Sequence, residues 1–243
     1  MRSLLVVPVE SAAALDSALS SGADAILLNL GDSSDTLSSP SNARLLARDF
    51  LRAAQFEAHR PLLYVRVQGL DDDAIDDDLA AIMVGEPDGL MLGHCRSGID
   101  VQHLGAKLAV YEAEFGLTDG ETGIIAEAGT TARALFSMGS YSDSSPRLMA
   151  LAWHAGRLAA DLGNGHSRSV DLSYAAPLAT ARNLAIIAAR AADVAAIDSA
   201  SADLDDDAFL AECKSARRDG FNAKIAASPT QIAIINAVFD QGA

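Results

Sequence analysis

The stretch PLLYVRVQGLDDDAIDDDLAAIMVGEPDGLMLGHC, residues 61–95, contains one complete strand–helix–strand unit. Its first eight and its last seven residues are short aliphatic runs, which is the pattern of buried strands. Between them, Ile75, Leu79 and Ile82 are spaced to lie on one face of a helix. Because parallel neighbours in a sheet need a crossover connection, a helix between two strands indicates that the strands are parallel.

The same alternation continues in both directions along the chain. Eight aliphatic runs are expected to form strands that begin at Ser3, Ala25, Pro61, Gly89, Thr122, Leu148, Ala195 and Asn222. Eight strand–helix units in 243 residues are the usual content of a closed (β/α)8 barrel. The sequence therefore predicts the α/β class, with a single TIM-barrel domain over residues 1–243. An open doubly wound sheet is the alternative, but it usually carries a glycine-rich loop after its first strand, and VVPVESAAA (6–14) has none.

Composition and charge narrow the classes of partner. Half of the residues are apolar and the formal net charge is −15, so we expect neither nucleic acid nor an anionic membrane as a partner. No apolar run approaches the roughly 20 residues of a membrane-spanning helix. Cys95 and Cys213 make neither a disulfide framework nor a metal-binding spacing, and we expect a reducing, cytoplasmic location.

In a TIM barrel the active site lies at the carboxyl ends of the strands, and this rule selects the first candidate residue. Arg66 alternates with Val65 and Val67, so we expect its side chain to point into the barrel while its neighbours pack on helices. A cation inside a barrel is costly unless it meets an anion. That anion is either a ligand or a strand-end acid such as Asp198.

Other polar residues in or after strands are less informative. Lys224 lies in NAKIAA (222–227), where an exposed lysine near the strand start is as good an interpretation as a functional one. His94 and His154 follow strands, but two histidines on separate loops do not make a metal site. Cys95 is expected to pack in the core rather than to act as a nucleophile. Three acidic clusters near helix starts are expected to be solvated, because they lack the pattern of a calcium loop: 71–73, 76–78 and 205–207.

Several stretches carry a resemblance to a known family. They are SLLVVPV (3–9), SGADAILLNLGD (21–32), YVRVQ (64–68), ADLG (160–163), AARAADVAAIDSASADLDD (188–206) and GFNAKIAASPTQIAIINAVF (220–239). The last one is the most specific, since it combines a lysine strand, a proline and a glutamine at fixed spacing. Over nearly its whole length the chain is similar to the citrate lyase β-subunit-like proteins of the HpcH/HpaI aldolase/citrate lyase superfamily.

The resemblance implies a magnesium-assisted carbon–carbon bond lyase, or the reverse reaction, acting on 2-oxoacid or CoA-thioester substrates, often as a trimer. Two carboxylates hold Mg²⁺, which polarises a carbonyl and stabilises an enolate, while an arginine orients the substrate carboxylate. Arg66 matches the family's substrate arginine, and Asp32 matches the last acid of its LDLED segment. Together with Thr130 and Asp198, they are the substrate-binding residues that we predict.

The acids that hold magnesium in the family are replaced here. Arg157 stands where a metal-binding aspartate is expected, in HAGRLAADLG (154–163) against the family's GAEDLAADLG. Gly129 stands where a metal-binding glutamate is expected, although Glu127 lies two residues earlier on the same side of the strand. A guanidinium beside a divalent cation would repel it by several kcal/mol. We therefore expect no metal cofactor, with Glu127 and Asp32 as fallback ligands.

Two functions remain open. In the first, the magnesium site is lost and the protein is inactive or repurposed: it binds a small anion near Arg66, Arg157, His94 and His154, or it is a non-catalytic partner subunit. In the second, it is an active metal-independent lyase or thioesterase. Arg157 then stabilises an enolate or oxyanion, and His94 or His154 acts as general acid or base. For either function the resemblance implies a homo-oligomer, as a trimer.

Overall fold

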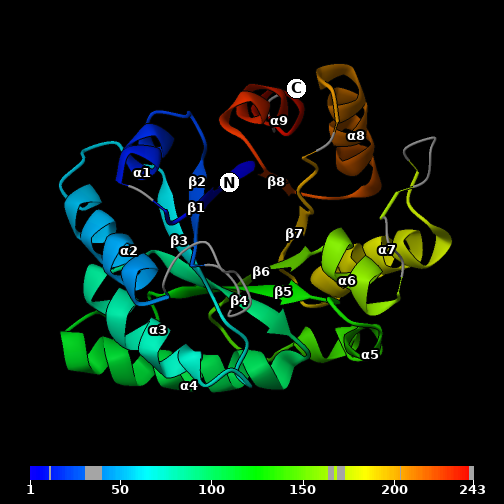
Figure 1. Cartoon of the computed structure of the whole chain (residues 1–243). Helices are drawn as coiled ribbons and strands as arrows, with labels where there is room; N and C mark the ends of the chain where they lie inside the picture. Colours follow the sequence, from blue (N-terminus) through cyan, green and yellow to red (C-terminus); the bar gives the residue numbers. More distant parts are fainter. Residues whose placement is uncertain (11, 31–39, 164–166, 169–172, 203, 241–243) are drawn as a thin grey trace.

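The computed structural model describes residues 1–243 except 11, 31–39, 164–166, 169–172, 203 and 241–243. Eight parallel strands close into a barrel in sequence order, with β8 paired to β1 (Figure 1). They are β1 (Ser3–Pro8), β2 (Ala25–Asn29), β3 (Leu62–Val67), β4 (Gly89–Cys95), β5 (Gly123–Ala128), β6 (Leu148–Trp153), β7 (Ala195–Asp198) and β8 (Ala223–Ala226). All eight predicted strands are present, so the closed TIM barrel is confirmed and the open-sheet alternative is wrong.

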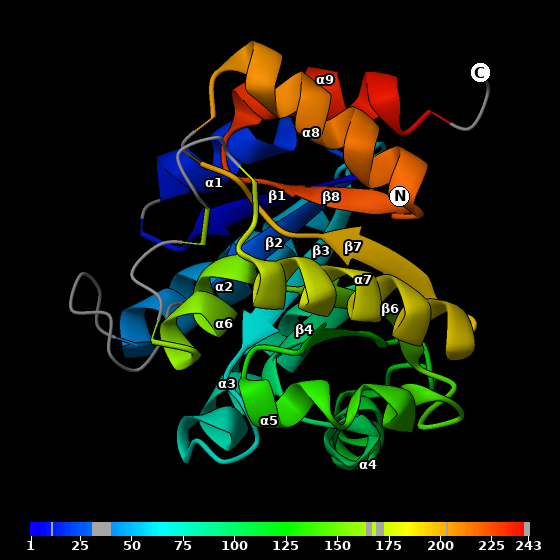
Figure 2. The ribbon, with the colours of Figure 1, turned by 90° about the vertical axis from the view of Figure 1, so that its right-hand side faces the viewer.

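Helices surround this barrel and connect its successive strands (Figure 2). They are α1 (Ala12–Leu19), α2 (Pro40–Ala54), α3 (Ala74–Ile82), α4 (Gly98–Phe115), α5 (Ala132–Leu135), α6 (Ala155–Asp161), α7 (Ala176–Ala191), α8 (Asp206–Asp219) and α9 (Ile232–Val238), with 3-10 turns at Met83–Gly85, Met138–Tyr141 and Pro229–Gln231. The helical spacing of Ile75, Leu79 and Ile82 is confirmed, because all three are buried on α3. Within the described residues, no helix combines the length and apolar character that crossing a membrane requires.

Successive strand residues alternate between the barrel interior and the layer under the helices. A small interior cluster takes residues from every strand, among them Leu4, Tyr64 and Ile125. A larger outer cluster contains their sequence neighbours, such as Val65 and Ile124. Each fully buried aliphatic side chain contributes about 1.5–3 kcal/mol. The outer cluster, being larger, therefore supplies most of the hydrophobic stabilisation, while the interior positions near the strand ends can carry polar residues.

One acidic cluster departs from the expectation of solvated helix ends. Asp78 is buried, and it accepts hydrogen bonds from Arg44 Nε (2.8 Å) and from the backbone N–H of Gln68 (3.3 Å). The expectation is therefore wrong for Asp78, which ties α3 to α2 and to the end of β3. Cys95 does pack in the core as predicted: it is buried, and burial raises the pKa of its thiol to about 12.

Candidate functional site

A buried ion pair lies inside the barrel near its mouth, the end formed by the carboxyl ends of the strands. Arg66 on β3 donates from Nε to Oε1 of Glu127 on β5 (3.3 Å) and from Nη2 to Oε2 (3.0 Å). A Cβ at Gly93, on the intervening strand, would lie 2.9 Å from Arg66 Nη2, so a glycine there leaves room for the guanidinium. The inward direction predicted for Arg66 is confirmed. Its acidic partner is Glu127, and the suggested pairing with Asp198 is wrong.

Two further groups converge on the Glu127 carboxylate. The backbone N–H of His94 donates to Oε2 (3.2 Å), and Arg157 Nε lies 3.5 Å from the same oxygen. Burial alone would raise the pKa of Glu127, but the charge of Arg66, supported by Arg157, outweighs burial and lowers the pKa to about 2. Glu127 is therefore ionised at neutral pH and is held by cations from β3 and α6.

His94 and Arg157 contact each other at the accessible side of this pair. Arg157 Nη1 lies 2.6 Å from His94 Nε2. Because a guanidinium only donates hydrogen bonds, this nitrogen accepts, and the ring proton of His94 is on Nδ1. His94 is exposed and has a φ of 50°, a left-handed conformation that is uncommon outside glycine.

His154 completes the group by capping α6. Its Nδ1 accepts a hydrogen bond from the backbone N–H of Arg157 (3.2 Å), the usual role of an N-cap side chain. Burial lowers the pKa of His154 by more than Glu127 raises it, so the imidazole is neutral at physiological pH, with its proton on Nε2. Arg66, His94, Glu127, His154 and Arg157 form the mouth cluster, which has two guanidinium charges and one carboxylate.

Thr130 follows β5 at the same end of the barrel. It is 2% exposed, and its Oγ1 has no hydrogen-bond partner among the described residues. The preceding Gly129 has a φ of 65°, a conformation that favours glycine. A buried hydroxyl without a partner is uncommon in folded proteins. It is consistent with the prediction that Thr130 contacts a ligand.

The described residues of the mouth do not fit a magnesium ion. Both oxygens of Glu127 accept hydrogen bonds from Arg66, Gly129 offers no side-chain ligand, and Arg157 holds its guanidinium against the same carboxylate. Within the described ranges, no group of three or more His, Cys, Asp or Glu side chains could hold a metal. This arrangement argues against Glu127 as a fallback ligand. Asp32, the other fallback ligand and a predicted substrate-binding residue, lies outside the described residues.

A second group of buried charges lies outside the barrel, between β7, β8 and α8. Lys224 is wholly buried and donates from Nζ to Asp198 Oδ2 (3.0 Å), Glu212 Oε1 (2.6 Å) and the carbonyl of Ser199 (2.7 Å). Trp153 Nε1 donates to the other oxygen of Asp198 (2.7 Å). The interpretation of Lys224 as an exposed lysine is therefore wrong.

Asp198 faces the helices, because the preceding Ile197 packs inside the barrel. Burial would raise the pKa of Asp198, but the charges of Lys224 and Arg182 outweigh burial and lower it. The structure does not bring Asp198 together with Arg66. Its predicted role in substrate binding gains no support from this position.

Further salt bridges balance this second group. The helix-side cluster consists of Arg168, Arg182, Lys224, Asp198, Glu212 and Asp219, and the exposed Arg218 also pairs with Asp219 at its edge. Neither Arg182 nor Glu212 stands out in the sequence, because charges are common in helices. A usable signal existed for Arg182, which is spaced with Leu178 and Ala185 on the buried face of α7.

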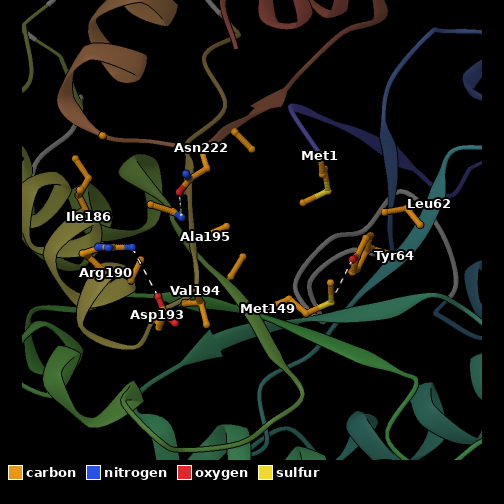
Figure 3. A pocket seen from close by; sticks show the side chains of 15 residues that line it. Met1, Leu62, Tyr64, Met149, Ile186, Arg190, Asp193, Val194, Ala195 and Asn222 are labelled. Carbon is orange, nitrogen blue, oxygen red and sulfur yellow. Dashed lines mark hydrogen bonds and ion pairs between the residues drawn. The ribbon is translucent and has the colours of Figure 1, made fainter. Parts of the chain in front are cut away.

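A cavity of about 720 Å³ lies at the opposite end of the barrel, where the strands begin (Figure 3). Its lining is mixed polar and apolar and includes Tyr64 and Met149, whose Sδ accepts a hydrogen bond from the Tyr64 hydroxyl (3.6 Å). Two charged residues line it: Arg190 and Asp193 are strongly exposed, and Arg190 Nη1 lies 3.7 Å from Asp193 Oδ1. The groups suited to chemistry therefore lie at the mouth and not at this end.

Comparison of the sequence with known proteins identifies one family. The profile of HpcH/HpaI aldolase/citrate lyase matches residues 2–229. The citrate lyase subunit beta of Leuconostoc mesenteroides subsp. cremoris is 28% identical over 240 residues, which are 98% of this chain and 76% of that protein. A (3S)-malyl-CoA thioesterase of Cereibacter sphaeroides (strain ATCC 17025 / ATH 2.4.3) is 30% identical over 241 residues, again 98% of this chain and 76% of the relative. The predicted resemblance is confirmed.

Solved structures agree with this result. RipC from Yersinia pestis is similar with a TM-score of 0.74 and 27% identity, covering 100% of this chain and 96% of that one. The protein CitE from Mycobacterium tuberculosis, in complex with magnesium and acetoacetate, has a TM-score of 0.80 and 23% identity, covering 99% of this chain and 91% of that one. At this lower identity the second likeness shows the shared fold alone.

Proposed function

The chain belongs to the HpcH/HpaI aldolase/citrate lyase family, and from this premise we propose that its mouth binds a small anionic metabolite without magnesium. The ligand class is a 2-oxoacid or an acyl-CoA, since similar proteins are a citrate lyase subunit and a malyl-CoA thioesterase. One observation carries the proposal. The guanidinium of Arg157 contacts both Glu127 and His94, in the place where a divalent cation would need an acid.

Several donors are available beside the Arg66–Glu127 pair. Arg157 has 20% of its side chain exposed, and a guanidinium binds a carboxylate through two parallel hydrogen bonds. The ring N–H groups of His94 and His154 and the hydroxyl of Thr130 can donate to the same anion. Among the described residues, two guanidiniums face one carboxylate in the mouth cluster, which favours an anion over a neutral ligand.

Isothermal titration calorimetry with pyruvate and with acetyl-CoA tests the proposal. Binding is expected to persist in EDTA, and Arg157→Ala is expected to weaken it by about tenfold or more, because a hydrogen bond to a charged group contributes about 1.5–3 kcal/mol. Arg96→Ala is the matched control, since Arg96 follows β4 on the same rim but pairs with Asp100. Binding that occurs only in the presence of magnesium contradicts the proposal.

A metal-independent thioesterase is the second candidate, favoured by the 30% identity to a malyl-CoA thioesterase. The N–H donors of the mouth cluster could stabilise an oxyanion. Both histidines, however, engage their acceptor nitrogen within the protein, His94 with Arg157 Nη1 and His154 with the backbone N–H of Arg157. They are therefore arranged to donate hydrogen bonds rather than to remove a proton from water. Hydrolysis of an acyl-CoA in EDTA that His154→Asn abolishes would favour this candidate over simple binding.

We also propose that the protein is a homo-oligomer, and a trimer by its family resemblance. Size-exclusion chromatography with light scattering is expected to give three chain masses, and a single chain mass contradicts this assembly. The cytoplasmic location stays a prediction from the sequence.

A further inference from the structure

The Glu127 carboxylate is surrounded by donors in the way a bound carboxylate ligand would be. Arg66 approaches it edge-on, with Nε 3.3 Å from one oxygen and Nη2 3.0 Å from the other. The backbone N–H of His94 and the Nε of Arg157 approach Oε2 from two other elements, at 3.2 Å and 3.5 Å. An edge-on guanidinium with additional N–H donors recognises the carboxylate group itself, whatever molecule carries it.

The residues that surround the Glu127 carboxylate are buried or small. Arg66 and Glu127 are 4% and 3% exposed, so both are shielded from solvent. Gly93 leaves the space that the guanidinium occupies. Ala152, the register partner of Glu127 on β6, is the small neighbour on the other side of β5. The Glu127 side chain therefore holds one carboxylate against a fixed set of donors.

We infer that Glu127 is an internal ligand: its side chain fills a complete carboxylate-binding site, and a small free monocarboxylate takes that site when the side chain is shortened. The consequence for specificity, which rests on the proposed function, is that the protein itself supplies one carboxylate to Arg66. An anionic group of the ligand is then expected to meet Arg157 rather than Arg66.

Thermal unfolding of Glu127→Ala in acetate and in chloride at equal ionic strength tests the inference. Acetate is expected to raise the melting temperature of this variant in a saturable way, with half-saturation on the order of millimolar for so small a ligand. A ligand that binds only the folded state at about ten times its Kd stabilises by about 1.4 kcal/mol. Propionate, which also replaces the lost methylenes, is expected to act at a lower concentration than acetate.

Two matched variants isolate the site. Glu127→Gln keeps the volume of the side chain and leaves no space, so its response to acetate is expected to be no larger than that of wild type. Glu127→Ala combined with Arg66→Met keeps the space but removes the main donor, so its response to acetate is expected to fall to the wild-type level. Wild type, in which the position is occupied, gives the response that arises at Arg157 alone, and a specific response is one that exceeds it.

Each outcome of these measurements either supports the inference or overturns it. A specific acetate response in Glu127→Ala that is absent from both control variants supports the inference. Equal effects of acetate on all variants, or no effect on Glu127→Ala, overturn it. A Glu127→Ala chain that stays unfolded in acetate and in chloride also overturns it, because a free carboxylate in this site must restore part of the lost stability. Failure of the proposed function is a separate result, since it is read from pyruvate and acetyl-CoA binding to wild type.

Discussion

Arg66 and Lys224 are both cations in the middle of aliphatic strands, and both are buried against carboxylates, but they belong to different kinds of site. Arg66 points into the barrel, where the described part of the mouth cluster has two guanidiniums, one carboxylate and an exposed His94. Lys224 points toward α8, into a helix-side cluster in which it is wholly buried and pairs with both Asp198 and Glu212. An enclosed set of paired charges fits a structural role, and a set that reaches the surface on one side fits ligand binding.

The largest effect is expected from a substitution in the helix-side cluster. Lys224→Met is expected to lower the free energy of unfolding by about 4 kcal/mol, because it leaves Asp198 and Glu212 buried without their main cation. Chemical denaturation measures this loss, and Lys224→Met combined with Asp198→Asn is expected to recover part of it. If the free energy of unfolding falls only as little as on loss of an exposed salt bridge, the helix-side cluster does not have this structural role.

The pH dependence of stability tests the ionisation state of the buried Glu127. Glu127 has a folded pKa of about 2, below its ordinary value of 4.5, so its stabilisation is fully present above pH 4.5 and is lost as the pH falls toward 2. The stability lost over this window from Glu127 is about 3 kcal/mol. Unfolding measured from pH 7 downward is expected to show a shallower decline in Glu127→Gln than in wild type.

Glu112 provides the control for that measurement. It is wholly buried, pairs with Arg147 (2.6 Å) and has the same lowered pKa of about 2, although burial would raise it. Glu112→Gln is therefore expected to reduce the pH dependence as well, but to leave pyruvate binding unchanged. A pH profile of Glu127→Gln that matches wild type contradicts the account of the mouth cluster.

Arg157→Ala is expected to have a smaller effect on stability. The side chain is 20% exposed, and its contact with Glu127 is the longer one, so the loss is expected to be at most about 1 kcal/mol. The same substitution is expected to remove most of the anion affinity. A variant that binds pyruvate normally but unfolds readily would assign Arg157 to structure and reverse the comparison between the two clusters.

Thr130→Val is expected to change stability least, within about 0.5 kcal/mol, because the Thr130 hydroxyl has no hydrogen-bond partner among the described residues. Its effect should be seen in ligand binding instead, as a several-fold weaker affinity for pyruvate in calorimetry. Thr131→Val is the neighbouring control for stability, since the Thr131 hydroxyl accepts a hydrogen bond from Ala134 and caps α5 (3.1 Å). If both variants lose the same stability, the Thr130 hydroxyl is engaged within the fold.

The barrel and the inward direction of Arg66 could be predicted from the order of residues. Eight aliphatic runs separated by amphipathic stretches leave few alternative folds, because parallel strands need helical crossovers. A length of about 250 residues is also typical of a barrel of eight strand–helix units. Arg66 lies at a strand end between two valines, and the only polar interior of a packed barrel is near its mouth. The replacement of a family acid by Arg157 stays a prediction from the resemblance of HAGRLAADLG (154–163) to the family's segment.

Tertiary structure alone decided which charges meet. In a strand that is buried on both faces, aliphatic residues surround a charge on either side, so periodicity does not say whether Lys224 points inward or outward. The pairing of Arg66 with Glu127 depends on the relative register of β3, β4 and β5, and on the space left by Gly93. Local propensities do not encode such cross-strand distances, because they arise from closing the barrel. The sequence determined which strands and strand ends carry cations, and the fold decided which carboxylate pairs with Arg66 and which with Lys224.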